Sequence, residues 1–251
     1  LAVADLQKAA KSSRGAQSAI IHTILADYYN AYYDNHRWEL YDQTATRNFQ
    51  KENIRSWGIA DFHKAITAEY SAALKDKQLL QRTSLAAFEP VIKKGNARNL
   101  RPTLYDLVAW KALEYYKEGN QDDKISVDEF QLNSPKLLAP ATEFMQELFV
   151  AENQNAYYFL AVQLYQDILR FHQADKDPAA FFDAYLNRLA FMQQNASMPG
   201  KNEAYQKTLE YYARTFEGVE GADQYSYLLA RSFMEQAPAD YKRALAICEK
   251  I

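Results

Sequence analysis

The sequence predicts an all-α protein built from stacked antiparallel helical hairpins. Apolar residues recur at intervals of three and four through most of the 251 residues. No alternating apolar and polar pattern persists long enough to indicate a β-strand. Glycine and proline number only 7 each, and they fall mostly between the periodic stretches, where residues that break helices belong.

In the first half, a long helix is expected to begin near Ala19 and to run toward His36. A second covers 59–75, where apolar and aromatic residues are spaced by four: Phe62, Ile66, Tyr70 and Leu74. Ser84 is placed to cap a short helix from Leu85 to Lys93, interrupted or kinked at Pro90.

Pro102 precedes the next helix, which should run through Lys117 and end at Gly119. Residues 120–135 have an irregular pattern, in which Ile125, Val127 and Phe130 could form a short extended piece. Further helices are expected at about 139–150, 155–173, 178–194, 201–216, 223–236 and 239–251.

This order predicts three parts. Residues 1–120 form N-terminal helical hairpins, 121–138 are an irregular connecting segment, and 139–251 are helical repeats cut at their C-terminal end. Because the chain starts at Leu1 and stops inside a helical run, we interpret it as a piece of a longer protein.

Large, small and large residues recur at offsets similar to those of tetratricopeptide repeats, in which a small residue lets two helices approach closely. Three sets of residues match the first helix of such a pair: Leu229, Ala230 and Phe233; Leu160, Ala161 and Leu164; Leu25, Ala26 and Tyr29. Residues 160 and 229 lie about two repeats apart. Tyr241, Ala244 and Cys248 give the matching second helix. A tetratricopeptide-like solenoid is therefore the predicted arrangement.

Composition narrows the possible functions. Lys and Arg total 29 and Asp and Glu total 32, so the net charge is −3, without the basic excess that nucleic-acid binding usually requires. No apolar run approaches the roughly 20 residues of a membrane span. Cys248 is the only cysteine, which excludes an internal disulfide. We interpret Cys248 as a small buried residue on a helix.

The sequence shows no catalytic, cofactor-binding or metal-binding site, and we expect the chain not to be an enzyme. Its four histidines do not pair at the helical spacing of metal ligands: His22, His36, His63 and His172. It contains no HExxH, no GxSxG and no glycine-rich phosphate loop. Asn195-Ala196-Ser197 matches a glycosylation sequon, which matters only in a eukaryotic secretory setting.

The stretch 118–129 resembles a calcium-binding EF-hand loop in its second half. Asn120, Asp122 and Glu129 could supply oxygen ligands and Ile125 the apolar anchor. However, Asp123 stands where the turn requires glycine, and Glu118 replaces the usual first aspartate. Ser134–Pro135 would soon interrupt an exit helix. We therefore predict that calcium does not bind.

Tyrosines crowd the first long helix, and two aromatics follow them: Tyr28, Tyr29, Tyr32, Tyr33, Trp38 and Tyr41. They could line a binding groove or pack between hairpins. Because adjacent residues point in different directions on a helix, some must face the core and others the surface. We favour packing.

Three runs resemble the helical N-terminal region of large alpha-2-macroglobulin-like proteins of Gram-negative bacteria: AIIHTILADYYNAYYDNHRWELYDQT, ENIRSWGIADFHKAI and RPTLYDLVAWKALEYY. Most of the match is carried by Trp38, Trp57, Pro102, Thr103, Leu104, Tyr105 and Asp106. The similarity covers 19–118 well and the rest loosely, with DYKRALAICEKI fitting a terminal repeat before the family's β-sandwich domains.

The resemblance implies an exported protein of the periplasm or cell envelope, often lipid-anchored, related to inhibitors that trap proteases through a Cys-x-Glu-Gln thioester. Here Glu249, Lys250 and Ile251 follow Cys248, so that motif is absent. Two hypotheses remain. The chain is either a non-catalytic scaffold of such a protein, contacting its other domains or an envelope partner, or a free-standing tetratricopeptide-like adaptor that binds a peptide or protein.

Overall fold

The computed structural model describes residues 2–41, 53–90, 92–93, 95–118 and 130–251. None of these residues belongs to a β-strand, and their regular structure is helical, which confirms the predicted all-α class. The chain forms two compact units, Leu1–Asp128 and Glu129–Ile251. The expected extended piece at Ile125 and Val127 lies outside the described residues, and Phe130 is in no strand.

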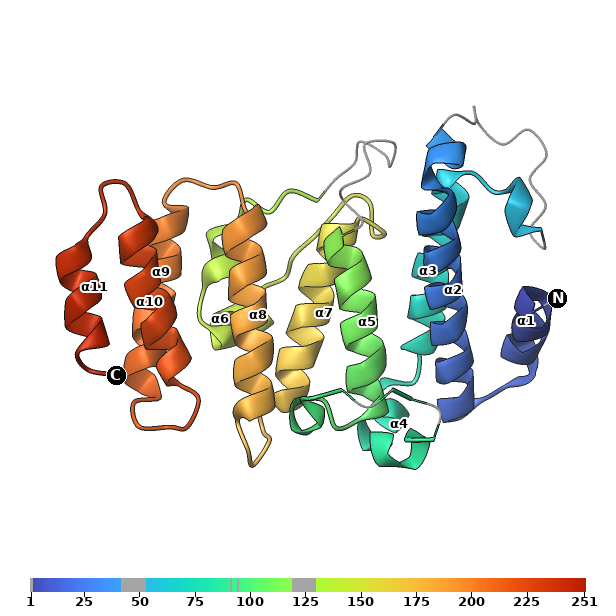
Figure 1. Cartoon of the computed structure of the whole chain (residues 1–251), viewed down its shortest axis with the longest axis horizontal. Coiled ribbons are helices and arrows are strands. Elements are labelled where there is room, and N and C mark those ends of the chain that lie inside the picture. Colours follow the sequence, from blue (N-terminus) through green and yellow to red (C-terminus); the bar gives the residue numbers. More distant parts are fainter. Residues whose placement is uncertain (1, 42–52, 91, 94, 119–129) are drawn as a thin grey trace. The chain divides into compact units, whose positions relative to one another are not determined.

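The first unit is organised by two long helices, α2 (Gly15–Tyr41) and α3 (Ile59–Ala73), which pack side by side (Figure 1). Three of the residues spaced by four, Phe62, Ile66 and Tyr70, are buried on α3. Burying a large apolar side chain stabilises a fold by about 1.5–3 kcal/mol. This stripe therefore explains why α3 packs on α2.

Aromatic rings fill the space between α2 and α3. Tyr29 and Tyr33 of α2 are buried, whereas Tyr28 is 40% exposed and Trp38 is 83% exposed. Trp57 precedes α3, and its ring lies 5.0 Å from that of Tyr29. The expected division of the tyrosines between core and surface is confirmed, and the buried ones pack the hairpin.

Two short helices of this unit were not expected. α1 (Ala2–Ser12) is tied to α2 by Gln7, whose side-chain amide donates to the Tyr29 hydroxyl at 2.9 Å. α4 (Lys77–Arg82) begins at Asp76, whose carboxylate accepts from the Leu79 backbone N–H. Both helices are too short to show a convincing period in the sequence.

The helix expected at 85–93 is wrong in length. Ser84 does cap its start, accepting from the Ala86 N–H at 3.2 Å, but only a 3-10 turn forms, η2 (Leu85–Phe88). Pro90 has no N–H to donate to the next helical hydrogen bond, so the turn ends ahead of Pro90 rather than bending there.

α5 (Leu104–Glu118) begins with a reciprocal capping box. The Asp106 carboxylate accepts from the Thr103 N–H at 2.9 Å, and the Thr103 hydroxyl oxygen accepts from the Asp106 N–H at 3.2 Å. Two backbone bonds, Leu85 to Pro102 and Leu104 to Thr83, fasten this start to the end of α4. The run Pro102–Asp106 thus fixes where α5 begins.

The second unit contains five longer helices that alternate in direction (Figure 1). They are α7 (Tyr157–His172), α8 (Ala179–Asn195), α9 (Lys201–Thr215), α10 (Asp223–Glu235) and α11 (Tyr241–Cys248). The small residues Ala161, Ala230 and Ala244 are buried in them. Residues 160 and 229, however, lie on α7 and α10, which are three helices apart and run in opposite directions. In a two-helix repeat, equivalent helices run in the same direction, so 160 and 229 do not occupy equivalent positions.

A short segment precedes these helices, η5 (Pro135–Leu138) and α6 (Ala141–Gln146), and it replaces the longer helix expected at 139–150. Its backbone groups are bound by side chains of the following helices. Arg188 of α8 donates to the carbonyls of Leu137 (3.1 Å) and Ala139 (2.9 Å). The Thr208 hydroxyl of α9 donates to the Leu138 carbonyl at 2.6 Å.

Gln166 of α7 extends this pattern, because its side-chain amide donates to the carbonyls of Phe144 (2.6 Å) and Glu147 (2.8 Å). The Ala141 N–H donates to the Tyr212 hydroxyl at 2.9 Å. Buried backbone groups outside a helix ladder need such partners. Polar side chains on three helices therefore hold an irregular segment in place.

Cys248 is exposed on α11, so our interpretation of it as buried is wrong. Ala244 is the residue that α11 buries, whereas Tyr241 and Leu245 are 68% and 61% exposed. The periodicity identified the helix but not the face that contacts α10. No helix within the described ranges combines the length and the apolarity needed to cross a membrane.

Candidate binding site

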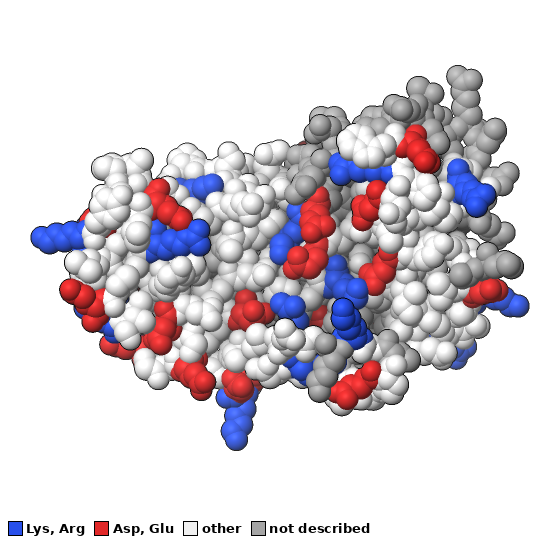
Figure 2. All heavy atoms as spheres, in the orientation of Figure 1, with Lys and Arg blue, Asp and Glu red and all other residues white. Residues whose placement is uncertain are grey.

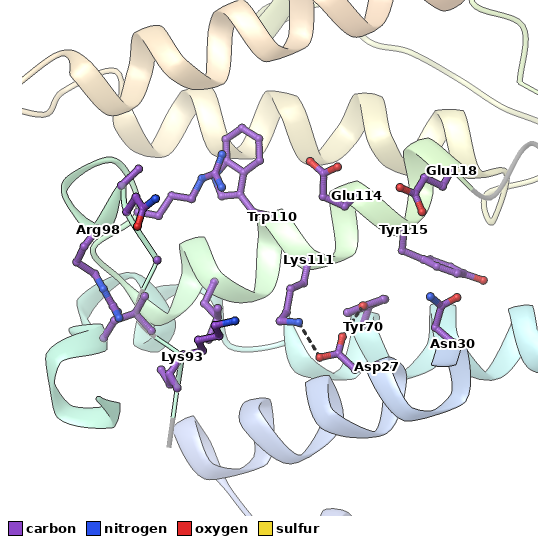
Figure 3. Close-up of a pocket in the computed structure, with 17 residues that line it drawn as sticks. Asp27, Asn30, Tyr70, Lys93, Arg98, Trp110, Lys111, Glu114, Tyr115 and Glu118 are labelled. Carbon is purple, nitrogen blue, oxygen red and sulfur yellow. Dashed lines mark hydrogen bonds and ion pairs between the residues drawn. The ribbon is translucent and has the colours of Figure 1, made fainter. Parts of the chain in front are cut away.

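A cavity of the first unit lies between α2, α3, α5 and the segment 92–101, with a volume of about 600 Å³. We call it the α5 groove (Figure 3). The residues that line it are Asp27, Asn30, Tyr70, Leu85, Ile92, Lys93, Gly95, Asn96, Ala97, Arg98, Arg101, Leu107, Trp110, Lys111, Glu114, Tyr115 and Glu118.

Helical spacing places one wall of the groove. Leu107, Lys111, Glu114 and Glu118 follow one another at intervals of four, three and four, so they share a face of α5. That face changes from apolar to basic to acidic along the helix. Since the capping box at Thr103 fixes the start of α5, it also fixes the position of this face.

A three-residue network crosses the middle of the groove. Asp27 of α2 accepts from the Tyr70 hydroxyl of α3 at 3.0 Å and from the Lys111 ammonium of α5 at 2.7 Å (Figure 3). Burial, and then the Asp27 charge, raises the pKa of Tyr70 well above its usual value. The phenol therefore stays protonated and donates to Asp27, which joins three helices.

Basic side chains gather at one end of the groove. Arg101 stacks on the Trp110 ring, with its guanidinium carbon 4.0 Å from the ring centre. Arg98 and Lys93 lie at the same end, whereas Glu114, Tyr115 and Glu118 lie toward the other (Figure 3). Nη1 of Arg98 is buried, and no described residue accepts a hydrogen bond from it. The groove thus has a basic end and an acidic end.

Outside the groove, charge is mixed. On the face seen in Figure 2, acidic and basic side chains are interspersed on each unit, and neutral residues cover most of the surface. No broad area of one sign is visible on that face, in keeping with the net charge of −3.

The structure places each histidine with a different partner and brings no two of them together. The Nδ1 atoms of His22 and His172 lie 2.5 Å from Glu69 and 2.6 Å from Asp175. Nδ1 of His36 lies 2.9 Å from the Tyr32 carbonyl. These contacts lie within one helix or hairpin, or at its end, and none belongs to the α5 groove.

His63 is the buried exception. Its Nδ1 lies 2.5 Å from the hydroxyl of Tyr115, whose ring lies on the groove. Burial, and then the charge of Arg37, lowers the pKa of His63 to about 4. The imidazole is therefore neutral at pH 7, and it joins α3 to α5. In the described part of the chain, no group of three or more His, Cys, Asp or Glu side chains could hold a metal ion.

Two further sequence motifs have different outcomes. Of the calcium-like stretch 118–129, only Glu118 is described; the other candidate ligands, Asn120, Asp122 and Glu129, lie outside the described residues. In the sequon, the Asn195 side chain donates to the Phe191 carbonyl at 2.9 Å and accepts from the Tyr158 hydroxyl at 3.1 Å. The Asn195 amide is thus engaged in packing.

The second unit has its own cleft of about 510 Å³ between α8, α9 and α10. Amide side chains dominate its lining. Gln193 donates to Asn202 at 2.7 Å, and Gln206 donates to Gln236 at 2.8 Å. These groups can donate and accept in pairs, as peptide backbones do.

The sequence did not predict the α5 groove. The run at Pro102–Asp106 gave a signal for the region, but its residues support the groove rather than line it. The charged lining comes from α2, α5 and an irregular segment, and only folding brings these together. Comparison of the chain with known protein families, with curated proteins and with solved structures finds no match.

Proposed function

We propose that the chain is a non-catalytic helical scaffold that binds a protein partner through the α5 groove, within a larger alpha-2-macroglobulin-like protein of the cell envelope. The observation that carries the binding role is the groove itself. It is solvent-accessible, lined by aromatic and charged side chains, and built on helices whose positions are fixed by the capping box and the Asp27 network.

The dimensions of the groove suit a polypeptide. From Leu107 to Glu118 the helix rises about 16 Å, at 1.5 Å per residue. An extended peptide covers that length with about five residues, at roughly 3.3 Å each. Trp110 and Tyr115 belong to its lining but are buried, so most of each ring packs against the protein itself.

Three polar groups on or beside the groove that could take part in catalysis have structural partners. Tyr70 and Lys111 bind Asp27, and His63 is neutral and buried against Tyr115. We therefore propose binding rather than catalysis.

A trypsin assay tests the non-catalytic, non-inhibitory part of the proposal. With the chain present, trypsin should cleave a large substrate at its usual rate, and a denaturing gel should show no adduct of chain and trypsin. A covalent adduct that methylamine prevents would contradict the proposal, because it would indicate thioester chemistry at Cys248.

The larger parent and its envelope location are proposed from the sequence resemblance. The proposed partner is another domain of the parent or a second envelope protein. Sequencing the gene on either side of this region tests the parent: a downstream region rich in β-strands supports it, and a short gene without one contradicts it. Fractionation of the producing cells tests the location.

A second candidate function is a free-standing tetratricopeptide-like adaptor. Supporting it are the alternating helices of the second unit, the buried alanines Ala161, Ala230 and Ala244, and the amide-lined cleft between α8 and α10. A peptide that bound there would lose affinity in Gln206→Ala and not in Arg98→Gln. Binding that depends on Arg98 favours the first candidate instead.

A further inference from the structure

The α5 groove is polarised along its length, and this polarity identifies the kind of partner that it fits. Arg98 lies at one end, and Glu118 at the other (Figure 3). Between them, Lys111 is paired with Asp27 at 2.7 Å, so the middle contributes little net charge. Along the wall that α5 provides, the helix rises about 16 Å from Leu107 to Glu118.

The basic end is the better-defined half. Nη1 of Arg98 is buried without an acceptor among the described residues. A buried donor left without a partner is unfavourable, and a charged one more so. Arg101, whose guanidinium carbon lies 4.0 Å from the centre of the Trp110 ring, adds a second guanidinium to the lining of the groove. Guanidinium groups match carboxylates in both charge and geometry. A carboxylate supplied by a ligand would give Arg98 the acceptor that the chain does not supply.

The acidic end selects the opposite charge. Glu118 is exposed, and the Glu114 carboxylate, 52% exposed, lies 3.1 Å from the Lys117 ammonium. Because Lys117 offsets the charge of Glu114, Glu118 supplies the net negative charge of this end, and it would attract a basic side chain and repel an acidic one. Leu107, one helical turn before Lys111 on α5, is half-buried and offers apolar surface, whereas Trp110 is buried.

This inference rests on the proposed function. We infer that the α5 groove binds an extended peptide whose charges are ordered: carboxylates at the Arg98 end, an apolar residue at Leu107, and basic side chains at the Glu118 end. Complementary charge contributes mostly to specificity and association rate. Charge order along the partner, rather than its net charge, is then what the groove distinguishes.

Two capped hexapeptides of identical composition test this inference. In the first, Asp-Asp-Ala-Leu-Lys-Lys, like charges are grouped in blocks, and we call it the blocked peptide. In the second, Asp-Lys-Ala-Leu-Asp-Lys, the charges alternate, and we call it the interleaved peptide. Isothermal titration of the whole chain at low salt should show the blocked peptide binding about tenfold more tightly, the factor expected from one additional charge-assisted hydrogen bond. This preference should shrink at high salt, because salt screens exposed charges.

Two variants locate the effect. Arg98→Gln should remove most of the preference for the blocked peptide, since it deletes the charge at the basic end. Arg214→Gln, on an exposed arginine of α9 paired with Glu210, is the matched control and should change nothing. Far-ultraviolet circular dichroism of each variant verifies that it is folded.

The outcomes separate the two proposals. If both peptides bind equally and Arg98→Gln weakens both, the groove binds peptides but charge order is overturned. If the blocked peptide binds more tightly and Arg98→Gln has no effect, the assignment of its carboxylates to Arg98 is overturned. If neither peptide binds at millimolar concentration, both the charge order and the use of the α5 groove for peptides are overturned.

Discussion

Replacing Arg188 by methionine should destabilise the second unit, although it removes a buried charge. The Arg188 side chain is fully buried, and its guanidinium carbon lies 4.2 Å from the Phe144 ring and 4.6 Å from the Tyr185 ring. Burial lowers the pKa of the guanidinium, and the neighbouring Tyr185 and Tyr212 oppose that shift. Arginine nevertheless stays protonated in proteins.

Two effects of opposite sign determine the result. Methionine relieves the desolvation of a cation, which is worth several kcal/mol. It also removes two charge-assisted hydrogen bonds, worth about 1.5–3 kcal/mol each, and two cation–π contacts, worth up to about 2 kcal/mol each when desolvated. These losses cancel the relief. What remains is the cost of leaving the Leu137 and Ala139 carbonyls without their donors, about 1–3 kcal/mol each.

We therefore expect Arg188→Met to lower the free energy of unfolding by about 2–6 kcal/mol. Arg214→Met is the control: the Arg214 side chain is 77% exposed, and its pair with Glu210 should be worth no more than about 0.5 kcal/mol. Urea denaturation followed by circular dichroism measures both. A variant at position 188 as stable as the wild type would refute the view that η5 depends on this arginine.

Three further predictions follow from buried contacts. His63 is neutral in the folded chain, so the unfolded chain binds more protons between pH 6.5 and about 4. As the pH is lowered through that window, the free energy of unfolding should decrease by up to about 1.4 kcal/mol per pH unit, and less steeply in His63→Gln. Urea midpoints measured at several pH values would contradict this if both proteins had the same slope. Ala230→Trp should lower the free energy of unfolding by about 1–3 kcal/mol through overpacking, whereas Ala246→Trp on the exposed side of α11 should leave it nearly unchanged. Equal urea midpoints for Ala230→Trp and the wild type would contradict the packing of this helical hairpin. Thr103→Ala should lower the free energy of unfolding by about 1 kcal/mol because it removes the cap of α5, whereas Thr215→Ala, at an exposed position, should change it little. Equal decreases in melting temperature for the two variants would argue against the capping box.

Sequence periodicity predicted the longer helices well. The stripe at Phe62, Ile66 and Tyr70 is long enough to show a helical period, and the structure buries all three residues. α1 and α4 were missed, because 11 and six residues offer too few turns for a period to stand out. The sequence correctly identified Pro90 as a residue that interrupts the helix, but it did not predict that the helical turn would already end at Phe88.

Packing partners were harder to predict than helices. The spacing of Tyr241, Ala244 and Cys248 marks a helix, yet the structure buries Ala244 and exposes Cys248. Which face of α11 is covered depends on α10, and a single-helix pattern does not contain that information. The polar support of η5 could not be foreseen either, since Arg188 and Thr208 lie about 50 and 70 residues from the carbonyls that they bind.

The α5 groove illustrates the same limit for the candidate site. Asp27, Tyr70 and Lys111 are unremarkable in the sequence, and they form a network only because three helices meet. The nearest sequence signal was the run at Pro102–Asp106. Its contribution is indirect, because it sets the start, and therefore the face, of α5.

The most direct test of the binding role uses the three tryptophan indole signals of a ¹⁵N-labelled sample. Trp110 is buried at the lining of the α5 groove, Trp57 is equally buried between α2 and α3, and Trp38 is exposed on α2. On titration with the blocked hexapeptide, the Trp110 indole resonance should shift progressively, while those of Trp57 and Trp38 stay in place. A titration that leaves Trp110 unchanged, or that moves only Trp38, would contradict the assignment of the α5 groove as the partner-binding surface.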